Sequence, residues 1–216
     1  MSRTERTEHL RIEGVPMVAT LVRGGDIGLL ALHGANEGGT AELAGIVAGR
    51  CGATSLVLTQ PGTRRPVHIP SARMAVDHCA LLGEFLSAVS LTVSLHGHMR
   101  PDAARTVYLG GGNREAALVL AQEFDACAPG FRAVTDVAAI PPALRGLHPR
   151  NPVNMTRRGG VQVELPLAAR TADPVKRHGV PDRPPQPVID ALVAGVARLS
   201  ASPDTQGTRT STQEPL

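Results

Sequence analysis

Two histidines and one glutamate have the types and spacing expected of a metal site. His33 and Glu37 are four residues apart, and a glycine that follows the histidine allows the backbone to approach a ligand closely. His96 lies much further along the chain and is also followed by a glycine. Imidazole nitrogen and carboxylate oxygen both suit zinc, and a catalytic zinc needs about three protein ligands and one open position. The pattern therefore predicts a zinc site formed by His33, Glu37 and His96.

Other interpretations of these residues stay open at this point. A histidine that follows a strand often only forms hydrogen bonds, and Glu37 can equally be a solvated loop carboxylate. Glu42 falls in the first turn of a predicted helix, where a carboxylate interacts favourably with the helix dipole. It could nevertheless take the place of Glu37 as the ligand, and His98 could take that of His96. The spacing alone leaves the carboxylate ligand undecided.

The elements that must position these residues follow from the hydrophobic pattern. Strands are predicted at Met17–Val22, Gly28–Leu32, Thr54–Leu58, Leu91–Leu95, Thr106–Leu109, Phe131–Thr135 and Val161–Leu165. Helices are predicted at Ala41–Arg50, Met74–Ser87, Arg114–Asp125 and Ile189–Leu199. The Arg-Gly-Gly-Asp segment at 23–26 predicts a hairpin that joins the first two strands.

Strands that alternate with helices predict an α/β fold with an open sheet and helices on both faces. The hairpin makes the expected sheet mixed. In open α/β sheets the functional groups gather beyond the carboxyl ends of the strands. Since His33 and His96 each follow a predicted strand, we expect them to meet at one edge of the sheet.

The chain length of 216 residues suits one α/β domain. We predict an N-terminal arm over residues 1–14, a single catalytic domain over 15–200 and a disordered tail over 201–216. The tail prediction rests on its high content of Ser, Thr, Pro and Gln, which cannot form a core. The oligomeric state is not predicted.

Composition and charge exclude several classes of function. The formal net charge is +3, but aromatic residues make up only 2% of the chain, so the stacking side chains of a nucleic-acid-binding protein are missing. No apolar run approaches the roughly 20 residues of a membrane span, and the amino-terminal residues lack the apolar segment of a secretory signal. We therefore expect a cytoplasmic protein with no nucleic-acid or membrane partner, although release by cell lysis stays open.

Five sequence blocks, in this order, resemble the phage-type poly-gamma-glutamate hydrolases. The blocks are Ala31–Ala44, His68–Ser71, Val93–Gly97, Val107–Gly111, and Asn151–Asn154 continuing through Gly159–Leu165. Together they cover most of residues 27–170. The resemblance implies a carboxypeptidase-like α/β fold, one zinc ion, and hydrolysis of γ-glutamyl amide bonds in an anionic polymer. It also implies that His33, Glu37 and His96 are the zinc ligands, with Glu42 as the alternative carboxylate.

The resemblance further implies roles for residues outside the metal site. Glu164 is the candidate general base, which takes a proton from the attacking water and returns it to the leaving amine. Met155 stands where an arginine is expected, so Arg157 and Arg158 become the candidate readers of a substrate carboxylate, because guanidinium groups bind carboxylates in a bidentate manner. His68 is a further candidate for substrate binding.

Two other functions are compatible with the same residues. The first is a zinc amidohydrolase that acts on a small N-acyl amino acid or a cell-wall peptide. The second is a non-catalytic protein that keeps the fold and binds an acidic ligand. Metal content and activity on the polymer would distinguish these functions from a poly-gamma-glutamate hydrolase.

Overall fold

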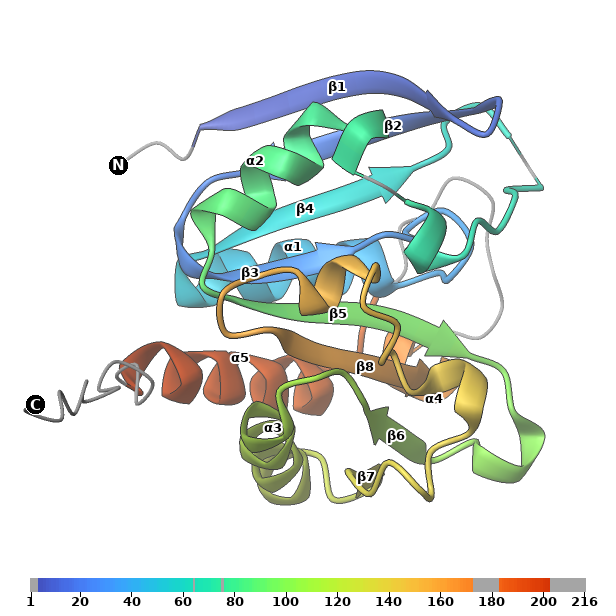
Figure 1. Ribbon diagram of the computed structural model, residues 1–216. Coiled ribbons are helices and arrows are strands. Elements are labelled where there is room, and N and C mark those ends of the chain that lie inside the picture. The colour runs from blue at the N-terminus through green and yellow to red at the C-terminus, as the bar shows by residue number, and fades with distance from the viewer. Residues whose placement is uncertain (1–3, 64, 75, 173–182, 203–216) are drawn as a thin grey trace, which may run out of the picture.

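A mixed sheet forms the centre of the structure (Figure 1). The computed structural model describes residues 4–63, 65–74, 76–172 and 183–202. Within them, the order of the eight strands across the sheet is β1 (Glu5–Ile12), β2 (Val15–Val22), β4 (Ala53–Thr59), β3 (Gly25–Ala31), β5 (Leu91–His98), β8 (Gly160–Pro166), β6 (Thr106–Leu109) and β7 (Arg132–Val134). The central strands β4, β3, β5 and β8 run parallel, whereas β1–β2, β2–β4 and β6–β8 are antiparallel pairs.

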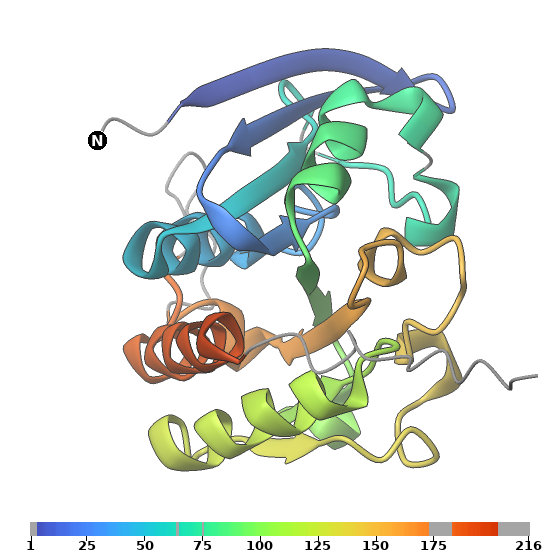
Figure 2. The same ribbon diagram turned by 60° about the vertical axis from the view of Figure 1, so that its left-hand side comes forward.

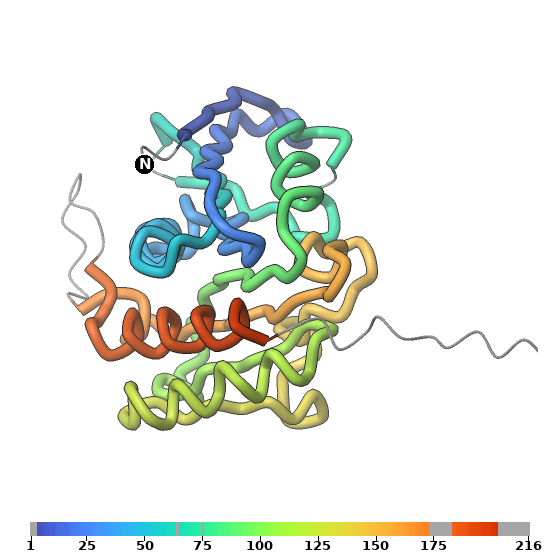
Figure 3. Tube along the Cα trace, turned by 90° about the vertical axis from the view of Figure 1, so that its left-hand side faces the viewer, coloured from blue at the N-terminus to red at the C-terminus, as the bar shows by residue number. Residues whose placement is uncertain are grey.

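Helices cover both faces of this sheet, as the sequence predicts. Helices α1 (Thr40–Cys51), α3 (Arg114–Cys127) and α5 (Gln186–Ala201) lie together on one face, whereas α2 (Ala80–Ala88) lies on the other (Figures 2 and 3). The short helix α4 (Leu167–Arg170) follows β8. Five short 3-10 helices complete the described elements: η1 (Ser71–Arg73), η2 (Val76–His78), η3 (Pro101–Ala103), η4 (Pro142–Leu144) and η5 (Pro152–Asn154). The described helices include none long and apolar enough to cross a membrane.

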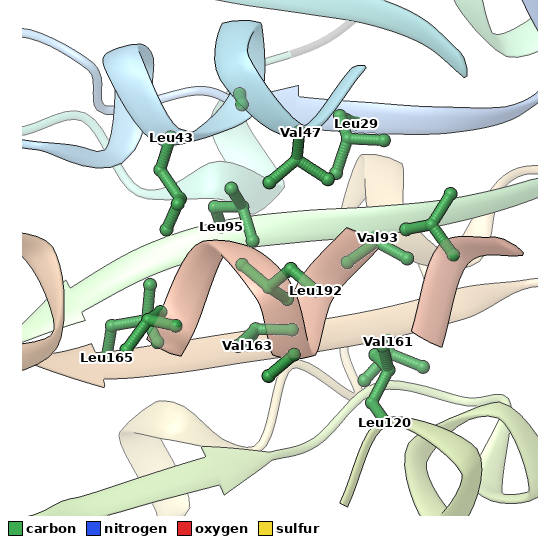
Figure 4. Close-up of a cluster of buried hydrophobic side chains, with 14 of the residues drawn as sticks. Leu29, Leu43, Val47, Val93, Leu95, Leu120, Val161, Val163, Leu165 and Leu192 are labelled. Atoms are coloured by element: carbon green, nitrogen blue, oxygen red, sulfur yellow. The ribbon is translucent and has the colours of Figure 1, made fainter. Parts of the chain in front are cut away.

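The two central strands β5 and β8 direct apolar and polar side chains to opposite faces. Leu91, Val93 and Leu95 of β5 pack with Val161 and its alternate neighbours on β8 in the core beneath α1, α3 and α5 (Figure 4). Because side chains alternate along a strand, the residues between them face the other way. The polar residues of both strands therefore project from the face opposite these three helices.

The predicted hairpin between β2 and β3 is wrong. β4 lies between these two strands and pairs with both, antiparallel to β2 and parallel to β3. The connection between β2 and β3 passes so close to the backbone of Ala53 that only glycine fits at position 24. A Cβ on Gly24 would lie 2.4 Å from the carbonyl oxygen of Ala53. The hairpin that does form joins β1 and β2 through Glu13 and Gly14, whose φ angles of 51° and 80° are those of a type I′ turn.

The predicted N-terminal arm is also wrong, because residues 5–12 form the edge strand β1. Its charged residues are largely exposed, whereas Ile12 is buried in a core shared with α2. A polar sequence is usual on an edge strand, where charges oppose pairing with another chain. At the other end, the predicted domain boundary at residue 200 falls inside the last turn of α5, and residues 203–216 of the predicted tail lie outside the described residues.

Candidate functional site

His33, Glu37 and His96 lie together at the carboxyl ends of two neighbouring parallel strands. His33 follows β3 closely, and His96 belongs to β5, which pairs with β3. His33 Nδ1 is 3.0 Å from Glu37 Oε1 and 3.1 Å from His96 Nδ1. His96 Nδ1 is 3.4 Å from Glu37 Oε2. One ligand atom from each residue lies within 4.8 Å of the others, so the three residues could hold a single metal ion.

A tight turn between β3 and α1 positions Glu37 opposite the histidines. The backbone N–H of Glu37 donates to His33 O over 2.9 Å, and Thr40 Oγ1 donates to Glu37 O over 2.8 Å. Gly39 continues the turn with a φ of 88°, a conformation that favours glycine. Gly97 N donates to Glu37 Oε2 over 2.9 Å, which ties the carboxylate to β5.

The donor set fits zinc. His33 Nε2 donates to the carbonyl oxygen of Ile69 over 2.8 Å, so in the neutral ring Nδ1 carries a lone pair that faces the other two residues. His96 Nε2 is held in turn by Ser94 Oγ at 3.0 Å. Bonds of this kind orient the imidazole ligands of metal sites. Donor atoms about 2.1 Å from a tetrahedral zinc would be roughly 3.4 Å apart, close to the spacing found here.

In the metal-free site, the carboxylate of Glu37 and the imidazole of His96 shift each other's pKa values. Burial acts to raise the pKa of Glu37, but hydrogen bonds with His33 and His96 and their charges outweigh it, and the pKa lies well below its usual range. Burial acts to lower the pKa of His96, but the hydrogen bond and charge of Glu37 raise it above its ordinary value. Glu37 is therefore ionised at neutral pH, as a carboxylate ligand must be.

Glu164 lies beside this cluster on β8, directly across from His96 in the parallel pair. It is buried, and burial raises the pKa of its carboxyl to about 7. The charge of His96 opposes the rise, whereas Glu37 adds to it. A carboxyl whose pKa lies near neutrality can both take and return a proton, which suits a general base.

His33, Glu37, His96 and Glu164 all line one cavity of about 410 Å³. The exposed His68 lines it, with its ring centroid 4.4 Å from that of His33. The segment that includes η4 and reaches Asn151, to which His148 belongs, also lines the cavity. His68 and His148 therefore both line the cavity, and the substrate-binding role of His68 stays a prediction.

Arg157 and Arg158 lie outside this cavity, contrary to expectation. They precede β8, and the backbone N–H of Arg158 donates to Ser90 O at the amino end of β5. Glu164 and His96 lie near the carboxyl ends of the same strands. The two arginines therefore lie at the amino ends of these strands, whereas the metal ligands lie at the carboxyl ends. They are too far away to bind a substrate carboxylate in the cavity.

The two alternative ligands also lie apart from the gathered donor atoms. Glu42 lies in the first turn of α1 and is not one of the three residues whose ligand atoms gather. His98 binds through Nε2 to Thr106 O over 2.9 Å and borders a different cavity. The geometry favours Glu37 and His96 over both alternatives.

Sequence reasoning missed the residues that hold the site residues in place. Ser94 orients His96, and Gln162 Nε2 donates to Glu164 Oε1 over 2.7 Å. A signal was present in the strand pattern, because Ser94 and Gln162 each precede a site residue by two positions and therefore share its face.

In the metal-free protein, the contribution of Glu164 to stability is expected to fall as the pH rises from about 5 to 8. The pKa of Glu164 is raised from 4.5 to about 7 in the folded state. The native state therefore holds this proton more tightly than the unfolded state, and the resulting stability is lost as the pH rises through about 7. The loss attributable to Glu164 is on the order of 3 kcal/mol.

Thermal unfolding with a chelator, at several pH values across this range, measures the effect. Glu164→Gln cannot ionise and should lose the part of the pH dependence that Glu164 contributes, whereas the part from His96, whose pKa is also raised, remains. Parallel curves for the two proteins would show that burial does not perturb this carboxyl.

Comparison with known proteins gives one family and several similar structures. A family model described as poly-gamma-glutamate hydrolase matches residues 8–175. A bacteriophage poly-gamma-glutamate hydrolase is 21% identical, with 87% of this chain and 91% of that chain covered and a TM-score of 0.70. Zinc-free YNDL is 20% identical, with 91% and 89% covered and a TM-score of 0.64.

A metallo-carboxypeptidase from Burkholderia cenocepacia is 11% identical, with 92% of this chain and 64% of that chain covered and a TM-score of 0.52. Comparison with curated proteins gives no match. The structural similarities establish a carboxypeptidase-like fold, which agrees with the expectation from the sequence.

Proposed function

The chain belongs to the poly-gamma-glutamate hydrolase family, and from this premise we propose that it is a zinc-dependent enzyme that cleaves the γ-glutamyl amide bonds of poly-γ-glutamate. The observation that carries the proposal is the convergence of His33, Glu37 and His96 at one point of a cavity that Glu164 also lines. Two imidazoles and one carboxylate are the donor set of many zinc peptidases. A separate carboxyl beside them supplies the acid–base chemistry that amide hydrolysis needs.

In this proposal His33, Glu37 and His96 hold the zinc ion. When bound, zinc acts as a Lewis acid that activates water and polarises the scissile carbonyl. Ile69 O and Ser94 Oγ orient the two imidazoles, and Gly97 N orients the carboxylate of Glu37. The ligand atoms are therefore arranged for the metal before it binds.

Glu164 moves the proton. As a carboxylate it accepts a proton from the attacking water, and as the acid it donates that proton to the nitrogen of the leaving amine. Burial raises the pKa of this carboxyl above its ordinary value, which favours the return of the proton to the leaving nitrogen.

The anionic substrate is recognised without arginine or lysine from the described lining of the cavity. Histidine N–H groups there can donate hydrogen bonds to an anion, and His68 and His148 are exposed to an incoming ligand. We assign the binding of a substrate carboxylate to His68, with His148 as a second histidine of the cavity lining. The neutral polar side chains of the lining can contact the uncharged amide groups of the polymer backbone.

The test is incubation of the zinc-loaded protein with poly-γ-glutamate, followed by measurement of polymer length. Shortening of the polymer, with no cleavage of poly-α-glutamate, is the expected result. Parallel reactions with N-acyl amino acids and with cell-wall peptides address the other amidohydrolase substrates. If only one of these is cleaved, the proposed substrate is wrong; if nothing is cleaved although zinc is bound, the hydrolase proposal itself fails.

A further inference from the structure

A chain of buried side-chain hydrogen bonds connects the cavity wall to Glu164. Asn151 Nδ2 donates to Gln162 Oε1 over 2.8 Å, and Gln162 Nε2 donates to Glu164 Oε1 over 2.7 Å. Each of the three residues is only 4% exposed. Buried hydrogen bonds of this kind are electrostatically stronger than those in water, and a satisfied network rigidifies its members.

The direction of these bonds follows from the chemistry of the end groups. An ionised carboxylate can only accept, so Gln162 must turn its NH₂ group toward Glu164. Gln162 Oε1 then needs a donor, which Asn151 Nδ2 supplies. The second N–H of Gln162 faces Leu144 O at 3.3 Å, so the amide uses its acceptor and both donors.

Backbone packing fixes the place of the Gln162 amide. The backbone N–H and C=O of Gln162 both pair with Gly110, at 3.2 and 2.8 Å. On the other side Gly146, with a φ of 65°, lies so close that a Cβ there would be 2.6 Å from Gln162 Oε1. The amide therefore has little room to rotate away from Glu164.

We propose that Asn151 and Gln162 are positioning residues that hold the Oε1 atom of Glu164 and leave Oε2 to take and return the proton. The inference rests on the proposed function, in which Glu164 is the general base. The proton of the attacking water passes to Oε2 and from there to the leaving nitrogen, while Oε1 keeps its bond to Gln162. This matters because a misplacement of about 1 Å at a reacting group can lower a rate by about 10²-fold.

Asn151→Asp isolates the donor from the rest of the side chain. Aspartate has nearly the same shape and keeps the acceptor that caps Val153 N, at 3.3 Å in this structure, and in an assay at a pH where it is ionised it cannot donate to Gln162. We expect the turnover number to fall about 10- to 100-fold, with KM changed less than about twofold and zinc content unchanged. Gln162→Met, which lacks the donor to Glu164, should give a loss of the same order.

A double-mutant cycle separates positioning from a purely structural role. Since Asn151 acts through Gln162, Asn151→Asp with Gln162→Met should be no slower than Gln162→Met alone. Losses that multiply would show that the two residues act independently and would overturn the proposal. Melting temperature and zinc content of every variant show whether it is folded and loaded, and Gln162→Met provides the test if Asn151→Asp does not fold.

Glu164→Gln, measured in the same assay, distinguishes a failure of this inference from a failure of the proposed function. Full turnover in Asn151→Asp and Gln162→Met, with Glu164→Gln inactive, overturns the positioning role and leaves the base assignment intact. If Glu164→Gln keeps full turnover, Glu164 is not the general base, and the positioning role of Asn151 and Gln162 is excluded with it. A slow Asn151→Ala beside a fully active Asn151→Asp would assign the effect to the cap and would also overturn the inference.

Discussion

His33→Ala and His96→Ala are each expected to abolish stoichiometric zinc binding and, with it, activity. The two imidazoles approach each other to 3.1 Å through their Nδ1 atoms, and each is oriented by a bond at its other nitrogen. Residues that only support a metal ligand typically contribute 10- to 100-fold to affinity. Removal of a ligand itself should therefore weaken zinc binding by more than about 100-fold.

Metal analysis after dialysis against dilute zinc measures this loss directly. Two other histidines serve as controls. His78 is exposed on η2, and His98 is buried on the same strand as His96 but binds Thr106 O. Both alanine variants should keep one equivalent of zinc. A His33→Ala protein that still holds a full equivalent would mean that the metal site lies elsewhere.

Glu164→Gln is expected to keep its zinc and lose most of its turnover. Glutamine is nearly isosteric, and its Oε1 can still accept the bond from Gln162 Nε2 that Glu164 accepts at 2.7 Å. It cannot take a proton at neutral pH. General acid–base catalysis contributes about 10²- to 10⁴-fold, so the turnover number should fall by that order. KM should change little, because the lost interaction belongs to the transition state.

Glu37→Gln is the matched comparison, since it makes the same chemical change at a residue with a different role. A neutral amide oxygen is a poorer zinc ligand than a carboxylate, so this variant should lose metal affinity first. Zinc content and turnover, measured together, separate the two roles. Loss of zinc in Glu164→Gln with retention in Glu37→Gln would reverse the assignments.

Local sequence patterns are sufficient to predict the short-range features of this protein. Alternation along residues 161–165 places Glu164 on the polar face of a strand. The glycine-rich turn after His33 brings Glu37 back toward His33 within four residues. Most helix and strand positions also follow from short-range periodicity. Asn113, for example, caps α3 through a bond from Ala116 N, and asparagine is a preferred residue at that position. These features depend on neighbours only a few residues away, which the sequence displays directly.

The contacts between distant segments, by contrast, depend on packing across the whole sheet. The sequence could not show that β4 enters between β2 and β3, because that pairing is between segments about 30 residues apart. It could not show the direction of β8, which is parallel to β5 and so places Arg157 and Arg158 at the edge away from His96. Local patterns specify which residues can form a strand, but only burial against the whole sheet selects its neighbours and its direction.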